Sequence, residues 1–217
     1  KWHLAHTTWF FECMVLAPNQ AGYRPFDESF NFLFTSYYET IGDRQPRPRR
    51  GMITRPTLDT VLAYREHVNE AITRLLEKTS DPAITELVEL GCHHEQQHQE
   101  LLLTDILHLF AQNPLQPAYK DPEPLAVDLA APAAPAWQSF DGGIVEVGHD
   151  GTSYHFDCEG PRHQALLEPH SLSRRLVTKG DWNDFNEDGV YRQPLHWLTA
   201  GWDTVRTNAW SMPLSWA

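Results

Sequence analysis

The sequence has few cysteines, no long apolar run and no surplus of basic residues, and each of these shortages argues against a class of protein. Its 217 residues include three cysteines, Cys13, Cys92 and Cys158, which are odd in number and far apart. This usage is typical of reduced thiols rather than of a disulfide framework, and we expect a cytoplasmic protein. Because no stretch of 18 apolar residues occurs, we expect no membrane-spanning helix and no membrane partner.

The charge balance is acidic. There are 29 Asp and Glu residues against 17 Lys and Arg, which gives a formal net charge of -12. A surface that binds nucleic acid needs an excess of Lys and Arg to meet the phosphates, so we expect no nucleic-acid partner. The 41% hydrophobic content is enough for a packed core, and the length allows one large domain or two modest ones. The sequence gives no information on the oligomeric state.

The first half of the chain has the pattern of helices. Apolar residues recur at spacings of three and four between positions 61 and 76, and Thr57 is a suitable N-cap for that helix. A second long helix is predicted to begin near Asp81, with Pro82 in its first turn. Residues 25–56, which are rich in Pro, Arg and aromatic side chains, are predicted to be irregular.

The composition changes twice after residue 112. Residues 113–136 contain repeated prolines and Ala-Pro steps, which are typical of a linker. Residues 137–217 hold six of the eight tryptophans, and GGIVEVG at residues 142–148 alternates like a strand. We therefore predict a helical domain at 1–112, a linker at 113–136 and a mostly irregular domain with short strands at 137–217. Neither end of the sequence opens or closes an element, so we expect a fragment of a longer chain.

The stretch CHHEQQHQE at residues 92–100 has the spacing of a metal site. On a helix, His94 and His98 lie one turn apart on the same face, so their two imidazoles can reach one metal ion. A third ligand must come from another element. The best candidate is His6 in LAHTTWFFE, a second predicted helix with an apolar, aromatic face.

Two alternatives compete for this stretch. The same letters contain the His-Glu-x-x-His signature of zinc proteases, in which Glu95 would be the base. Those enzymes take their third ligand from a downstream residue, and no His-x-x-Gly-x-x-His pattern continues after His98, which disfavours a protease. The other alternative is a pair of surface histidines, because twelve histidines make chance pairs at this spacing plausible. Spacing alone leaves that alternative open.

Several segments, in the same order along the chain, resemble one enzyme family. HEQQHQELLLTD at residues 94–105 resembles the His-x3-His-x-Glu helix of the ergothioneine-biosynthesis sulfoxide synthases, and LAHT at residues 4–7 is similar to their first ligand segment. FDCEGPRH at residues 156–163 resembles the segment that opens their second domain. The similarity continues in two shorter segments, residues 177–180 and 189–191.

This resemblance implies a fold, a cofactor and a reaction. The protein would combine α and α+β parts: a DinB-like four-helix bundle, followed by an incomplete C-type-lectin-like domain related to formylglycine-generating enzyme. His6, His94 and His98 would bind Fe(II). With O2, the enzyme would join hercynine to a thiol, forming a C–S bond and a sulfoxide.

The resemblance also implies roles for other residues. Tyr37 and Tyr38 match a position where one branch of the family carries active tyrosines, and a phenol near iron could protonate reduced oxygen; such a pair is equally typical of packed aromatics. Arg47 and Arg50 have the spacing of two arginines that hold the carboxylates of γ-glutamylcysteine, although such a run is often solvated surface. Gln97 could hydrogen-bond the imidazole of hercynine.

The identity of the thiol stays open. The arginine spacing favours γ-glutamylcysteine, whereas the tyrosine pair and the LLLTD segment of the metal helix favour cysteine. Three other functions also remain: a zinc- or nickel-dependent thiol transferase on the same bundle, a selenoneine synthase that uses a seleno-sugar, and a non-catalytic module that uses only the lectin-like part.

Overall fold

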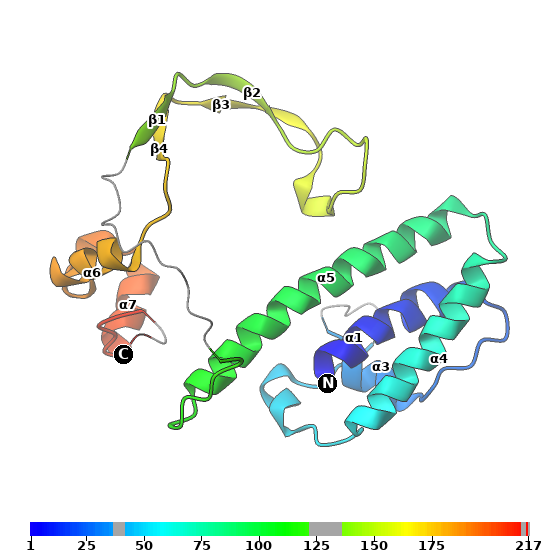
Figure 1. Cartoon of the computed structure of the whole chain (residues 1–217). Helices are drawn as coiled ribbons and strands as arrows, with labels where there is room; N and C mark the ends of the chain where they lie inside the picture. Colours follow the sequence, from blue (N-terminus) through cyan, green and yellow to red (C-terminus); the bar gives the residue numbers. More distant parts are fainter. Residues whose placement is uncertain (37–41, 122–135, 214–215, 217) are drawn as a thin grey trace. The chain divides into compact units, whose positions relative to one another are not determined.

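The computed structural model describes residues 1–36, 42–121, 136–213 and 216, and its elements are shown in Figure 1. The chain divides into two compact units, Lys1–Tyr119 and Lys120–Ala217. The first unit is helical, whereas the second contains short antiparallel strands together with helices. This mixture is compatible with the predicted combination of α and α+β parts.

In the first unit, the N-terminal helix lies beside two long helices (Figure 1). α1 (Trp2–Phe10) continues through a π-helical segment, Phe11–Leu16, into the short α2 (Ala17–Asn19). α4 (Leu58–Leu76) and α5 (Pro82–Ala111) both contact α1. α1 therefore lies against each of the two long helices.

Both long helices begin where the sequence predicts. At the start of α4, the side chain of Thr57 accepts a hydrogen bond from the N–H of Thr60. At the start of α5, the side chain of Asp81 accepts one from the N–H of Ala83, and Pro82 is the first helical residue. Each side chain satisfies an N–H that has no partner within the helix, which fixes the two boundaries.

Residues 25–56 are more regular than predicted. They contain α3 (Ser29–Phe34) and a 3-10 helix at Arg47–Met52. Phe30 and Phe34 lie one turn apart on α3, and both are buried. Burial of these two rings explains why a helix forms here, and six residues are too few to give a clear periodic pattern in the sequence.

The core of the first unit lies between α1, α3 and α4. A carboxylate, Glu12, is buried beside it and accepts hydrogen bonds from the hydroxyls of Tyr64 and Tyr23, at 2.7 and 2.8 Å. These donors compensate for removing the carboxylate from water. The buried apolar residues of this core are Ala5, Trp9, Phe10, Leu16, Phe30, Phe34, Val61, Tyr64, Val68 and Ala71.

α5 approaches the π-helical segment closely at Gly91. This glycine is buried, and a Cβ added to it would overlap the ring of Phe11 and come close to Phe10. Only the absence of a side chain allows this approach. The contact matters for function because α1 and α5 carry the candidate metal ligands.

The second unit contains two separate two-stranded antiparallel sheets. β1 (Trp137–Phe140) pairs with β4 (His170–Ser173), and β2 (Gly143–Val147) pairs with β3 (His163–Leu167). The strand predicted at residues 142–148 is confirmed as β2. Two helices that the sequence analysis did not predict, α6 (Lys179–Glu187) and α7 (Thr199–Thr207), follow the strands.

A local signal for α6 is present in the sequence. The side chain of Thr178 accepts a hydrogen bond from the N–H of Asp181, and the carboxylate of Asp181 accepts one from the N–H of Thr178. This reciprocal pair is a capping box, and the spacing Thr-x-x-Asp could have predicted the start of the helix. Within the described residues, no helix is both long and apolar enough to cross a membrane.

Candidate metal centre

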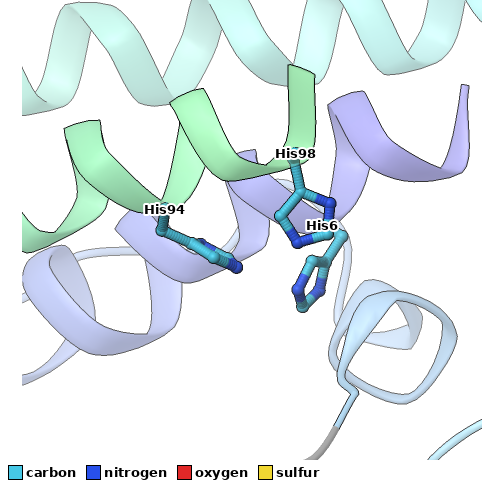
Figure 2. A group of neighbouring side chains, drawn as sticks. All are labelled: His6, His94 and His98. Atoms are coloured by element: carbon cyan, nitrogen blue, oxygen red, sulfur yellow. The ribbon is translucent and has the colours of Figure 1, made fainter. Parts of the chain in front are cut away.

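Three histidines from two helices converge in the first unit (Figure 2). His6 lies on α1, and His94 and His98 lie one turn apart on α5. One ring nitrogen from each lies within 4.8 Å of those of the other two. The ring centroids are separated by 4.6 to 5.0 Å. The packing of α1 against α5 therefore brings His6 together with His94 and His98, which lie 88 and 92 positions further along the sequence.

The ring of His6 is held on several sides. Its Nδ1 lies 2.6 Å from the carbonyl oxygen of Phe34. A carbonyl only accepts hydrogen bonds, so Nδ1 carries the hydrogen and Nε2 keeps a lone pair. The ring also stacks with Trp2 and Trp9, with centroid distances of 4.7 and 5.6 Å. This arrangement fixes both the tautomer and the plane of the imidazole before any metal binds.

The two histidines of α5 have different surroundings. The Nδ1 of His94 is buried and has no hydrogen-bond partner among the described residues. A buried polar nitrogen without a partner is costly, and a metal ion would satisfy it. His98, by contrast, places its Nδ1 2.9 Å from the Nδ1 of His3.

Burial keeps these imidazoles neutral. Removal from water lowers the pKa of His6 to about 3, and the neighbouring His94 and His98 act in the same direction. Burial likewise lowers the pKa of His98 to about 4 and also lowers the pKa of His94. Because a metal ligand must be a neutral imidazole, the cluster is ready to bind a cation at neutral pH without first losing protons.

The donor set fits a divalent transition metal. Three imidazole nitrogens suit Fe(II), zinc, nickel or copper, and the absence of a carboxylate among these three ligands would leave the centre cationic. The geometry alone does not choose among these metals. It does satisfy the requirement that three ligand atoms can approach a common point.

Glu95, which would be the base of a zinc protease, is engaged elsewhere. Its carboxylate makes two contacts with the guanidinium of Arg65 on α4, at 3.0 and 3.2 Å. Arg65 also donates a hydrogen bond to the hydroxyl of Thr7 on α1. Arg65 thus joins α4 to both α1 and α5, and the pairing of Glu95 with Arg65 favours a structural role for Glu95 over that of a proteolytic base.

A cavity of ≈ 960 Å³ opens beside the three histidines. Arg47, Arg50 and Gln97, which the sequence analysis selected as substrate-binding residues, all line it. The guanidinium of Arg50 lies 4.3 Å from the centroid of the Trp2 ring, and it donates to the carbonyl oxygen of Thr35. Cations and an amide therefore lie next to the metal ligands. Tyr37 and Tyr38 fall outside the described residues.

Sequence reasoning did not assign a role to three neighbours of the site. Trp2 stacks on His6, His3 contacts His98, and Asp105 contacts His3. All three also line the cavity. The spacings give partial signals: His3 and His6 are three apart on one helix, and Asp105 lies two turns beyond His98. Only the packing of α1 against α5 shows that His3 lies between His98 and Asp105 and contacts both.

Comparison with known proteins gives two curated relatives, while no family model matches the chain. A hercynine oxygenase of Mycolicibacterium thermoresistibile is 29% identical over 167 residues, which cover 76% of this chain and 36% of the relative. A hercynine oxygenase of Mycobacterium tuberculosis is 33% identical over 60 residues, which cover 28% of this chain and 14% of that relative. The chain thus spans about a third of the length of the first relative.

Both relatives are named for hercynine, the substrate that the resemblance implied, and the match with the first extends over 76% of this chain. The predicted resemblance is therefore confirmed as a similarity: this chain is similar to proteins named hercynine oxygenase.

Proposed function

We propose that this chain is part of an Fe(II)- and O2-dependent enzyme that joins hercynine to a thiol during ergothioneine biosynthesis. The observation that carries the proposal is the convergence of His6, His94 and His98 on one point. The similarity to two hercynine oxygenases supports hercynine as the substrate. Within this proposal, the first unit is a DinB-like bundle and the second is part of a domain related to formylglycine-generating enzyme.

The proposed reaction is balanced with O2 as the oxidant. Hercynine loses the hydrogen on the imidazole carbon between its two nitrogens, and the thiol loses its S–H hydrogen. The new C–S bond and the oxidation of sulfur to a sulfoxide together remove four electrons. One oxygen atom enters the sulfoxide, and the other leaves as water with the two hydrogens.

His6, His94 and His98 would hold the iron at the wall of the cavity that they line. Bound Fe(II) supplies open coordination positions and the redox chemistry that O2 requires. The protein contributes by holding the reacting groups near one another, an effect that lowers the barrier by removing most of the entropy cost of their encounter. The cationic character of a three-imidazole site also favours an anionic thiolate.

Side chains that line the cavity are suited to the two organic substrates. Arg47 and Arg50 would bind the carboxylate of the thiol substrate, because guanidinium groups and carboxylates form paired hydrogen bonds. Gln97 is exposed to the cavity on the turn that carries His98, and it would hydrogen-bond the imidazole of hercynine. Tyr37 and Tyr38 remain the proposed proton donors. We propose cysteine or γ-glutamylcysteine as the thiol.

Metal analysis combined with substrate titration tests the proposal. The full chain is loaded with Fe(II) without oxygen and titrated with hercynine, while the absorption of a nitric oxide complex is followed. We expect hercynine to change this spectrum and Gln97→Leu to weaken the response about tenfold without loss of iron, as a lost hydrogen bond to a polar substrate would. Gln96→Leu, an exposed neighbour outside the cavity lining, is the matched control.

Two results would count against the proposal. Tight binding of zinc or nickel with no Fe(II) binding and no response to hercynine would favour the thiol transferase. Equal responses of Gln97→Leu and Gln96→Leu would remove Gln97 from the substrate site. Mass spectrometry of the sulfoxide formed with cysteine, γ-glutamylcysteine or a seleno-sugar then separates the possible donors.

A further inference from the structure

His98 is the start of a hydrogen-bonded chain that leads away from the metal site. Its Nδ1 lies 2.9 Å from the Nδ1 of His3, and the Nε2 of His3 lies 2.9 Å from a carboxylate oxygen of Asp105. His98 and Asp105 both lie on α5, seven residues apart, while His3 comes from α1. This series of hydrogen bonds therefore starts on α5, runs through His3 of α1 and ends on α5 about two turns further on.

The chemistry of the three groups fixes the direction of the hydrogen bonds. An ionised carboxylate can only accept, so the Nε2 of His3 donates to Asp105. In a neutral His3 the Nδ1 then has a lone pair and accepts from the Nδ1–H of His98. The hydrogen of His98 is thus held on Nδ1, and its Nε2 keeps the lone pair that a metal ion requires.

The opposite direction would disable the ligand. If the Nδ1 of His3 donated, the Nδ1 of His98 would have to accept, and the hydrogen of a neutral His98 would move to Nε2. That nitrogen could not bind a metal. Asp105 requires the Nε2 of His3 to donate a hydrogen bond. Through His3 it therefore favours the tautomer of His98 that carries its hydrogen on Nδ1 and leaves Nε2 free for a metal ion.

We propose that Asp105 and His3 position the imidazole of His98 for metal binding. This inference rests on the metal-binding role of the three histidines in the proposed function. It adds two positioning residues outside the ligand set. The Nδ1 of His98 faces His3 as the Nδ1 of His6 faces the carbonyl oxygen of Phe34.

Exposure separates this role from a purely structural one. The side chain of Asp105 is 72% exposed, whereas that of His3 is 17% exposed. A pair with one member largely in water contributes little to folding stability. Groups that orient a metal ligand, however, typically change metal affinity by about 10- to 100-fold. Loss of Asp105 should therefore be seen in metal binding and hardly at all in the unfolding of the metal-free protein.

The test measures Co(II) and Fe(II) affinity of the full chain by chelator competition. We expect Asp105→Ala and His3→Phe to weaken binding about 10- to 100-fold and to change the visible spectrum of bound Co(II). His3→Phe keeps the ring and removes both nitrogens. Asp105→Asn and His3→Asn each keep an acceptor for one of the two hydrogen bonds, and they should restore part of the affinity.

Controls separate this inference from the proposal on which it rests. Glu89→Ala removes an exposed carboxylate from the same helix and should leave affinity unchanged. If it weakens binding as much as Asp105→Ala, the effect is one of net charge and the inference is wrong. If His98→Ala abolishes binding while Asp105→Ala and His3→Phe bind within twofold of the unmodified chain, only the inference fails. If His98→Ala itself binds normally, the metal site is wrong.

Discussion

The two units of the chain are stabilised in different ways. In the described residues, the buried apolar side chains lie almost entirely in the first unit, and only Val190 and Val205 belong to the second. The strands of the second unit are largely exposed and form two sheets of two strands each. Such small sheets have marginal stability on their own. The first unit depends on packing, whereas local hydrogen bonds are prominent in the second.

This difference shows why a metal site can form in the first unit. Binding by three imidazoles requires their nitrogens to be held near one point, and tight packing between helices provides that precision. Phe34, which orients His6, is itself part of the core. In the second unit, the ion pair between Arg175 and Asp181 organises one turn next to the capping box of α6.

Glycine-to-alanine changes in the two units should have opposite signs. Alanine normally stabilises a helix by up to about 1 kcal/mol relative to glycine. At Gly91 the new methyl group would overlap Phe11, so we expect Gly91→Ala to destabilise the chain by about 1–3 kcal/mol and to weaken metal binding. At Gly180, in α6, the nearest atom would be at an ordinary contact distance, 3.5 Å, and alanine should be neutral or stabilising.

Urea unfolding of both variants measures this pair of effects, with Co(II) titration alongside. A stabilising effect of Gly91→Ala with unchanged metal affinity would show that the contact between α1 and α5 does not set the geometry of the site. A strongly destabilising effect of Gly180→Ala would contradict the expectation that a methyl group fits at this position of α6.

Acid should act on the second unit through Asp181. The guanidinium of Arg175 and the hydrogen bonds from Thr178 hold the pKa of this carboxyl well below its usual range. The carboxylate therefore stabilises the start of α6 above about pH 4, and this contribution is lost as the pH falls below that value toward the folded pKa. The effect is small because these side chains are partly in water.

Amide hydrogen exchange near the start of α6, at several pH values, measures how much stabilisation by Asp181 is lost in acid. Asp181→Asn should show faster exchange at neutral pH and a weaker dependence on acid, while the amides of α4 stay unchanged. If the variant and the unmodified chain respond to acid in the same way, the capping box does not control this helix.

Local signals in the sequence predicted a substantial part of the fold. Thr57 and the Asp81-Pro82 pair fixed the starts of two helices because caps act through neighbouring backbone groups. The alternation at residues 142–148 predicted β2, because successive side chains of a strand point to opposite faces. This signal is also local in the sequence. The sequence did not predict α3, because its burial depends on contacts with helices that are distant in the sequence. The start of α6 does have a local signal, the capping box of Thr178 and Asp181.

The residues of the candidate site also differ in whether local spacing or tertiary packing reveals them. The spacing of His94 and His98 is local, so it could be read from the sequence, whereas His6 required the family resemblance or a choice among several histidines. The role proposed for His3 was invisible, because it depends on how α1 and α5 pack. Arg47, Arg50 and Gln97 line the cavity as their proposed roles require, and their contacts with substrates remain predictions.

The central claim is that His6, His94 and His98 together bind one metal ion. The most direct measurement is X-ray absorption of the full chain loaded with one equivalent of Fe(II), repeated for His6→Ala, His94→Ala and His98→Ala. The account predicts three imidazole ligands around a single iron, with binding abolished in His98→Ala and lost or strongly weakened in the other two variants. An unchanged iron environment at full occupancy in His6→Ala would contradict it, because the ligand from α1 would then be absent from the site.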